Sequence, residues 1–336
     1  MRFTIIGSGA IGGVTGAYLA RAGHAVTFVD VAGEHVAAIN DRGLHISGHA
    51  DFTVRVPACL PHELRGPLGT VILAVKSHHT EEALAPLAQL LGPDEAVLSM
   101  QNGLEELKIA RIVGPERTIG AFLTFGAHGE GPGEVVYGGP GTLRVGEIDG
   151  RISPRVRELE QALSVLQPVA VTDNIFGYLW GKLALGSIYF ATALVDADVP
   201  DIFDHPAYRP LLEDICGEAV AVAEACGVTP EAFDGFDCKV MRLGQRDSAL
   251  TAGSWDGQRA YWNSHVQRRT GIWRDLAVWK RKTEVEALLG AVLREAERFG
   301  VEAARSRVVY RMIKEIEEGR RAMSWGNLDQ VKRIVQ

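Results

Sequence analysis

The sequence predicts an α/β domain built on a doubly wound parallel sheet, followed by an all-helical domain. Three observations lead to this fold class. Strand-like and helix-like segments alternate through the first half, glycines punctuate the chain directly after the first strand, and helical periodicity dominates from about residue 175. A chain of 336 residues suits two domains, which we expect at 1–173 and 174–336.

The first half contains five apolar runs typical of strands, with helical patterns between the early ones. Strand–helix–strand order at these lengths predicts parallel pairing through right-handed crossovers. The predicted strands are FTII at 3–6, HAVTFVD at 24–30, GTVILAVKS at 69–77, EAVLSMQNG at 95–103 and RTIGAFLTFG at 117–126. The predicted helices are AIGGVTGAYLARAG at 10–23, EHVAAINDRG at 34–43 and TEEALAPLAQLL at 80–91. The glycine- and proline-rich stretch at 129–146 predicts a hairpin-like meander that extends the edge of the sheet.

The second half carries only helical patterns. The segment LWGKLALGSIYFATALV at 179–195 is apolar throughout, as a helix buried on most sides would be. Three further segments have amphipathic periodicity, and two of them end at glycine. They lie at 209–227, 283–300 and 306–321.

Charge and hydropathy exclude several classes of partner. The formal net charge is −7, and no lysine or arginine block is present, which argues against nucleic acid and anionic membranes. The basic run WKRKTE at 279–284 is typical of a solvated helix face or a local anion contact. No apolar run is long enough to span a bilayer, and strand sequence begins at Phe3 without a leader. We therefore expect a cytoplasmic protein.

The cysteines and histidines do not indicate a metal site. Four cysteines are scattered without a CxxC pair, so neither metal-ligand spacing nor a disulfide framework is expected. The adjacent pair His78-His79 would point in different directions on a regular element. We expect no bound metal.

The motif GSGAIG follows the first strand and opens the first helix. In a Gly-x-Gly-x-x-Gly motif, Gly7 permits a tight turn, Gly9 lets the backbone approach a pyrophosphate, and Gly12 allows close helix–sheet packing. The helix N-terminus presents unpaired N–H groups to negative charge. The motif predicts a Rossmann-type dinucleotide site whose binding residues are Gly7, Ser8, Gly9, Ala10, Ile11 and Gly12.

Asp30 ends the second predicted strand, eighteen residues after Gly12. Its carboxylate can accept hydrogen bonds from the ribose hydroxyls of NAD, whereas the phosphate that NADP carries there would be repelled. NAD is therefore the expected cofactor, with NADP as the alternative. The competing interpretation is that Asp30 only caps the short helix that begins near Gly33.

With these motifs, the chain resembles the ketopantoate reductase family along nearly its whole length. The resemblance rests on five short motifs in family order, namely GSGAIGG at 7–13, LAVKSHHTEEAL at 73–84 with Lys76, SMQNGLEE at 99–106 with Asn102, WGKLA at 180–184 with Lys182 and KRKTEVEALLG at 280–290 with Glu284. The family has a Rossmann domain followed by a helical domain, with the active site in the cleft between them. A homodimer is expected from the resemblance alone.

The resemblance also implies roles for four residues. Lys182 would be the general acid that protonates the carbonyl oxygen as hydride arrives, and Asn102 would hydrogen-bond the substrate near the nicotinamide. Glu284 would contact substrate or cofactor, and Lys76 would lie near the adenosine end of the cofactor. The competing interpretations are a solvated helix lysine for Lys182 and an ordinary acidic helix start for Glu284.

The chain departs from the family pattern at three places. Gly186 and Phe190 stand where the family has asparagines that hold the hydroxylated end of ketopantoate. Val31 replaces the arginine common in NADP-dependent members, and Thr270 or Gly271 replaces a serine before the Glu284 segment. We therefore expect Gly186, Phe190 and Thr270 at the substrate site, with Ser187 or Tyr189 as further candidates for contacts to the substrate tail.

The sequence thus favours an NAD(P)-dependent oxidoreductase that interconverts a 2-oxo acid and a 2-hydroxy acid other than ketopantoate. One alternative is a genuine 2-dehydropantoate 2-reductase. Other dehydrogenases of similar domain order, such as opine or 3-hydroxyacid dehydrogenases, are less favoured because no His–Glu pair occurs in a convincing context. A non-catalytic dinucleotide sensor is an alternative from a different class.

Overall fold

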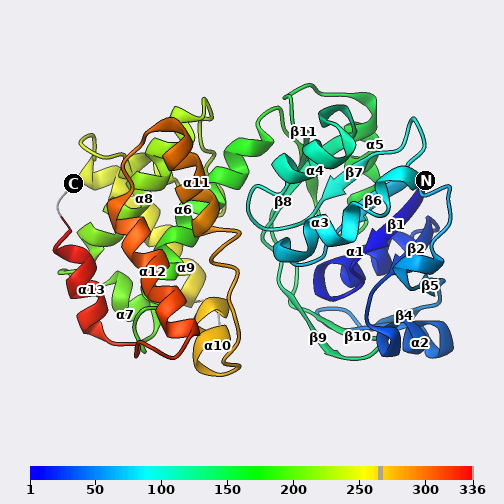
Figure 1. Cartoon of the computed structure of the whole chain (residues 1–336), viewed down its shortest axis with the longest axis horizontal. Helices are drawn as coiled ribbons and strands as arrows, with labels where there is room; N and C mark the ends of the chain where they lie inside the picture. The colour runs from blue at the N-terminus through cyan, green and yellow to red at the C-terminus, as the bar shows by residue number, and fades with distance from the viewer. Residues whose placement is uncertain (264–267, 335–336) are drawn as a thin grey trace. The chain divides into compact units, whose positions relative to one another are not determined.

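The computed structural model describes residues 1–263 and 268–334, which form two compact units, Met1–Ile175 and Phe176–Gln336 (Figure 1). The first unit holds all the strands of the described chain. The main sheet has the order β12-β11-β8-β7-β6-β1-β2-β5. Its strands are β1 (Arg2–Ile6), β2 (Ala25–Val29), β5 (Ala58–Cys59), β6 (Thr70–Leu73), β7 (Val97–Ser99), β8 (Thr118–Leu123), β11 (Leu143–Glu147) and β12 (Val169–Val171).

Helices cover both faces of this sheet, as expected for a doubly wound fold. The helices of the first unit are α1 (Ala10–Arg21), α2 (Gly33–Arg42), α3 (Thr80–Leu84), α4 (Glu106–Val113) and α5 (Pro154–Leu163). Alternate residues of β1 enter two different cores: Ile5 packs with α1 and α5, and Ile6 packs with α3 and α4. The strand order reverses between β1 and β6, so the carboxyl ends of these strands flank the crevice where such sheets bind ligands.

The glycine-rich meander does not extend the main sheet along its whole length, which corrects one expectation. Its first part forms a hairpin of β9 (Ala127–Gly131) and β10 (Glu134–Tyr137) that joins a separate four-stranded sheet. The partners are β3 (Leu44–Gly48), parallel to β10, and β4 (Phe52–Val54), both in a segment for which the sequence indicated no strand. Only β11 lengthens the main sheet, antiparallel to β8. The apolar positions of β3 and β10 join the core on the α1 side of the main sheet, whereas β9 is the largely exposed edge strand of the small sheet.

The predicted helix at 80–91 is also shorter than expected. It ends at Leu84, and a 3-10 turn follows at Ala88–Leu90. Pro86 explains the break, because proline lacks the N–H that continues a helix and clashes with the preceding turn.

In its described part, the second unit contains helices and no strands. Its helices are α6 (Ile175–Thr192), which starts at the last residue of the first unit, α7 (Val199–Phe203), α8 (Arg209–Ala225), α9 (Ser248–Asn263), α10 (Gly271–Ala277), α11 (Leu289–Phe299), α12 (Ala304–Glu317) and α13 (Trp325–Lys332). The buried Glu218 of α8 accepts hydrogen bonds from the N–H groups of Arg305 and Ser306, which ties α8 to the start of α12. No helix in the described ranges is both long and apolar enough to cross a membrane.

Candidate functional site

Residues 7–9, here called the glycine loop, connect β1 to α1 and are closely packed against neighbouring atoms at Gly7. Gly7 has a φ of +89°, and a Cβ there would lie 2.8 Å from Val75. A Cβ on Gly12 would lie 2.0 Å from the carbonyl oxygen of Gly7. A Cβ on Gly9, by contrast, would have no heavy atom within 4 Å. The first and third glycines are therefore required by packing, and the second leaves open space in front of the helix.

The N-terminus of α1 suits an anion. Within the described chain no side chain caps this helix at Gly9, and its first turn contains no acidic residue. The N–H groups of Ala10, Ile11 and Gly12 therefore point out of the helix end without a capping side chain. Such a terminus attracts negative charge through its dipole and its unpaired donors, so these residues fit a dinucleotide pyrophosphate.

Asp30 lies beside this loop at the carboxyl end of β2. Its Oδ2 accepts hydrogen bonds from the N–H and the hydroxyl of Ser8, at 2.8 and 3.2 Å, and its Oδ1 accepts from the N–H of Ala32 at 3.0 Å. The N-cap position of α2 is Ala32, not Asp30. The interpretation of Asp30 as a helix cap is therefore wrong, because the carboxylate holds the turn before the helix and the glycine loop instead.

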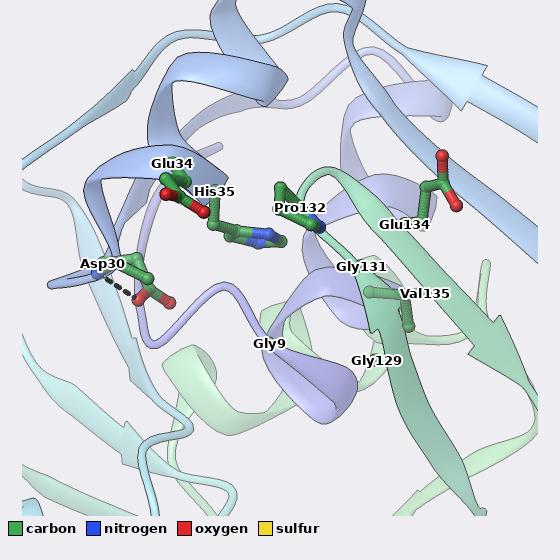
Figure 2. Close-up of a pocket in the computed structure, with 10 residues that line it drawn as sticks. Gly9, Asp30, Glu34, His35, Gly129, Gly131, Pro132, Glu134 and Val135 are labelled. Atoms are coloured by element: carbon green, nitrogen blue, oxygen red, sulfur yellow. Dashed lines mark hydrogen bonds between the residues drawn. The ribbon is translucent and has the colours of Figure 1, made fainter.

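A pocket of about 310 Å³ opens beside Asp30 (Figure 2). Three segments enclose it, namely the glycine loop, the start of α2 and the turn between β9 and β10. The charged or titratable residues of its lining are Asp30, Glu34, His35 and Glu134. Figure 2 shows the His35 side chain reaching from α2 toward the turn at Pro132. Three carboxylates around one opening make it unfavourable for an additional phosphate group.

Lys76 and Asn102 follow neighbouring strands and lie on adjoining loops. Lys76 comes after β6 and is exposed, whereas Asn102 comes after β7 and is half-buried. The hydroxyl of Ser77 donates to the backbone carbonyl of Asn102 at 2.9 Å, and the Gln101 amide donates to the carbonyl of Val75 at 2.8 Å. Because β6 pairs with β1, both loops lie at the same edge of the sheet as the glycine loop.

In the second unit, Lys182 lies on α6 as the sequence predicted. Between residues 177 and 191 of this helix, four residues are half-buried and the rest are buried. The four are Tyr178, Lys182, Gly186 and Tyr189, spaced by four, four and three residues, so they form one stripe along the helix. We call these four residues the α6 stripe.

The stripe has a gap at Gly186, where a Cβ would have no heavy atom within 4 Å. The next residue along it is Tyr189, whose hydroxyl donates to Gln258 at 2.8 Å and accepts from the Trp262 indole at 3.2 Å. Burial raises the pKa of the Tyr189 phenol. Phe190 has no exposed surface, and the Ser187 hydroxyl donates to the carbonyl of Leu183. The sequence placed Phe190 at the substrate site, but Phe190 is buried in the core, and its half-buried neighbour Tyr189 belongs to the α6 stripe instead.

The other two predicted residues of this unit, Thr270 and Glu284, lie outside the interiors of the helices. Thr270 is the N-cap of α10, where its hydroxyl accepts from the N–H of Trp273 at 3.0 Å. Glu284 does not lie on a helix, because α11 begins only at Leu289. Thr283 explains this correction: its N–H and hydroxyl both donate to Glu317, and its oxygen accepts from Val285, which favours a turn over helix.

Sequence reasoning missed His35 and the β9–β10 turn as parts of the site. No local sequence pattern could predict the contacts of His35, because its hydrogen-bond partners are 27 and 98 residues away in the chain. The density of glycine and proline at 129–133 was the only sequence signal for the turn. In the described residues, no group of three or more potential ligands is arranged to hold a metal ion.

Comparisons with known proteins agree with this architecture. The family model "Ketopantoate reductase PanE/ApbA" matches residues 3–150, and the model of the C-terminal domain of the same family matches residues 174–317. Two relatives are 2-dehydropantoate 2-reductases, one from Pyrococcus abyssi and one from Pyrococcus horikoshii. They are 30% and 28% identical to this chain, and each alignment covers 94% of this chain and 97% of the relative.

Solved structures are similar over the same length. A PanE/ApbA family ketopantoate reductase from Ralstonia eutropha has a TM-score of 0.78 at 26% identity, covering 95% of this chain and 99% of that one. D-mandelate dehydrogenase with NADH and anilino(oxo)acetate has a TM-score of 0.81 at 21% identity with the same coverage.

The fold and the glycine loop together define an NAD(P)-dependent oxidoreductase that acts on a CH–OH or C=O group. More particularly, the chain belongs to the ketopantoate reductase family.

Proposed function

We propose that this protein reduces a 2-oxo acid to the 2-hydroxy acid with NADH as the preferred cofactor, and that the substrate carries an apolar tail. The observation that carries the proposal is the α6 stripe, in which Lys182 is followed one turn later by an open space at Gly186. A reacting carbonyl near the lysine would thus have its tail beside a glycine.

The residues of the chain supply the proton and orient the substrate. NADH, when bound, would supply the hydride for the carbonyl carbon. The Lys182 ammonium would give its proton to the carbonyl oxygen, so a hydroxyl group forms in place of an alkoxide, and solvent would then reprotonate the lysine amine. Asn102 hydrogen-bonds the substrate, and Glu284 contacts substrate or cofactor, as the resemblance implies. Thr270 keeps one hydroxyl proton for a substrate contact while it caps α10.

The preference for NADH rests on the pocket beside Asp30. Its lining includes three carboxylates and no arginine, and Val31, at the position where NADP-dependent relatives commonly carry an arginine, is 82% exposed. The 2′-phosphate of NADPH would meet negative charge there, whereas ribose hydroxyls can donate to a carboxylate. Lys76 is the basic residue expected nearest to the adenosine end.

The proposal that the substrate has an apolar tail rests on the two residues of the α6 stripe that follow Lys182, namely Gly186 and Tyr189. Glycine offers no side-chain hydrogen bond, and the hydroxyl of Tyr189 already donates to Gln258 and accepts from Trp262. A hydroxylated tail would therefore be buried with fewer partners, at a cost of about 1–3 kcal/mol for each unsatisfied group. The D-mandelate dehydrogenase that shares the fold acts, by its name, on an acid with an aromatic tail.

A genuine 2-dehydropantoate 2-reductase is the second candidate. The names of the Pyrococcus relatives favour it, since both alignments span nearly the whole chain. In that case, residues other than those at 186 and 190 would hold the 4-hydroxyl of the substrate.

One kinetic panel separates these functions. The purified protein is offered ketopantoate and 2-oxo acids with branched or aromatic tails, each with NADH and with NADPH. We expect the highest kcat/KM for NADH with a bulky apolar 2-oxo acid. Ketopantoate as the best substrate would establish the second candidate, and dinucleotide binding without turnover on any substrate would favour a sensor.

The assembly is also a proposal. We infer a homodimer from the family resemblance, and light scattering coupled to size-exclusion chromatography measures its mass directly. A mass near 36.3 kDa, that of one chain, would contradict the dimer.

A further inference from the structure

His35 joins two segments that are far apart in the chain. Its Nε2 lies 2.9 Å from the carbonyl oxygen of Ser8 in the glycine loop. Its Nδ1 lies 2.9 Å from the backbone nitrogen of Gly133 in the β9–β10 turn. His35 itself lies in the first turn of α2 and is half-buried, so three elements meet at one imidazole ring.

These two contacts fix the protonation state of the ring. The N–H of Gly133 can only donate, so Nδ1 must accept and carries no proton. The carbonyl of Ser8 can only accept, so Nε2 must carry the proton. The geometry therefore requires the neutral Nε2–H tautomer, and an imidazolium would place two donors against each other at Gly133.

The contact with Ser8 sets the orientation of a peptide in the glycine loop. The Ser8–Gly9 peptide is planar and trans, so holding the Ser8 carbonyl oxygen fixes the direction of the Gly9 N–H on the opposite side. Asp30 holds Ser8 from its other side, through the N–H and the hydroxyl. Ser8 is thus fixed at both of its peptides, immediately before the uncapped start of α1.

We propose that His35 is a positioning residue for the dinucleotide: in its neutral form it holds the glycine loop and the β9–β10 turn in the arrangement that receives the cofactor. This inference rests on the proposed dinucleotide site. His35 lines the pocket beside that site, together with the glycines of the turn, so the second sheet supplies one wall of it. His35 orients the loop by holding Ser8 and takes no part in hydride or proton transfer.

The charged groups around the ring come from three elements. Asp30 and Glu34 belong to the end of β2 and the first turn of α2, and Glu134 belongs to β10. Arg42, at the end of α2, donates to the carbonyl of Pro132 in the turn and lies 3.9 Å from Glu134. Substitution of His35 leaves all of these groups in place, so a comparison with the wild type isolates the contribution of the histidine.

The test measures NADH affinity by fluorescence titration and turnover in the same samples. His35→Ala should raise the Kd for NADH about ten-fold, as expected for the loss of two hydrogen bonds. The kcat at saturating NADH should stay within about two-fold, because the uniform binding that is lost does not affect the chemical step. His45→Gln is the matched control, since His45 lies in the same small sheet, but its ring pairs with the exposed Asp51 and does not line the pocket. An unchanged Kd in His35→Ala would overturn the proposal.

A pH series separates positioning from a general loss of stability. From about pH 8 to pH 5, the range in which histidines gain a proton, the NADH affinity of the wild type should fall. His35→Gln keeps a donor and an acceptor but cannot be protonated, so its affinity should change less over this range. Parallel pH profiles in the two proteins would overturn the proposal even where His35→Ala does not fold. Failure of the wild type to bind NADH at any pH would instead overturn the cofactor site itself.

Discussion

The Asp30 carboxylate accepts hydrogen bonds from both the N–H and the hydroxyl of Ser8, at 2.8 and 3.2 Å. The residue proposed to select NAD over NADP therefore also shapes the loop that receives the pyrophosphate. Cofactor choice and loop geometry depend on one side chain. Substitutions at Asp30 must be interpreted with both effects in view.

Asp30→Ala should weaken NADH more than NADPH. The variant loses a charge-assisted bond to ribose, worth about 1.5–3 kcal/mol, and also removes the repulsion of the 2′-phosphate. We expect the preference for NADH, measured as a ratio of kcat/KM values, to fall by about ten- to a hundred-fold. Asp41→Ala, at an exposed aspartate of α2, is the control and should keep the wild-type ratio. A wild-type enzyme that already prefers NADPH would contradict the role of Asp30 and direct attention to Lys76.

Lys182→Ala should fold normally and lose turnover. Loss of a general acid typically lowers kcat by about 10²–10⁴-fold. The Kd for NADH should barely change, because the role proposed for the lysine is on the substrate and not on the cofactor. Lys182→Met, which retains the length of the side chain, should be equally inactive, whereas Lys332→Ala, at an exposed lysine of α13, should be active. Retention of most of the turnover would show that another residue donates the proton, and Glu284 would be the first candidate.

The wild type should be a poor ketopantoate reductase, with kcat/KM below about 10⁴ M⁻¹s⁻¹. Gly186→Asn should raise ketopantoate activity and lower activity on bulky apolar acids, because the new amide enters the space one turn from Lys182. The substitution should be tolerated, since a Cβ at this position would have no heavy atom within 4 Å. Gly253→Asn is the control: that glycine of α9 has equally open space and should leave the substrate profile unchanged. Efficient reduction of ketopantoate by the wild type would contradict the apolar-tail proposal.

Glu284→Gln should lower kcat/KM by about ten-fold, through loss of one charged contact of about 1.5 kcal/mol. Glu286→Gln is the matched control two residues away. Glu286 is exposed and pairs with Arg294 and Tyr310, and exposed ion pairs contribute little. Equal effects of the two substitutions would show that Glu284 acts through folding of the turn and not through substrate or cofactor.

The sequence by itself determined the fold class and the place of the glycine loop. These features depend on local patterns: the strand–glycine–helix order around Gly7–Gly12, and the apolar periodicity of α6 and α8. The steric reason for Gly12 could be predicted from the motif alone, and the structure supplies the distance, because a Cβ there would lie 2.0 Å from the Gly7 oxygen. The apolar segment 179–195 also predicted the helix that carries Lys182 and Gly186.

Only the tertiary structure decided which distant residues meet. The β9–β10 hairpin pairs with β3, about ninety residues earlier in the chain, and no local pattern specifies such a partner. His35 contacts Ser8 and Gly133, which are 27 and 98 residues away in the chain. Glu284 lies outside the helix that the sequence predicted, because Thr283 donates a hydrogen bond to Glu317. Local propensity determines the elements, whereas burial and the satisfaction of hydrogen bonds between remote segments determine the pocket beside the glycine loop.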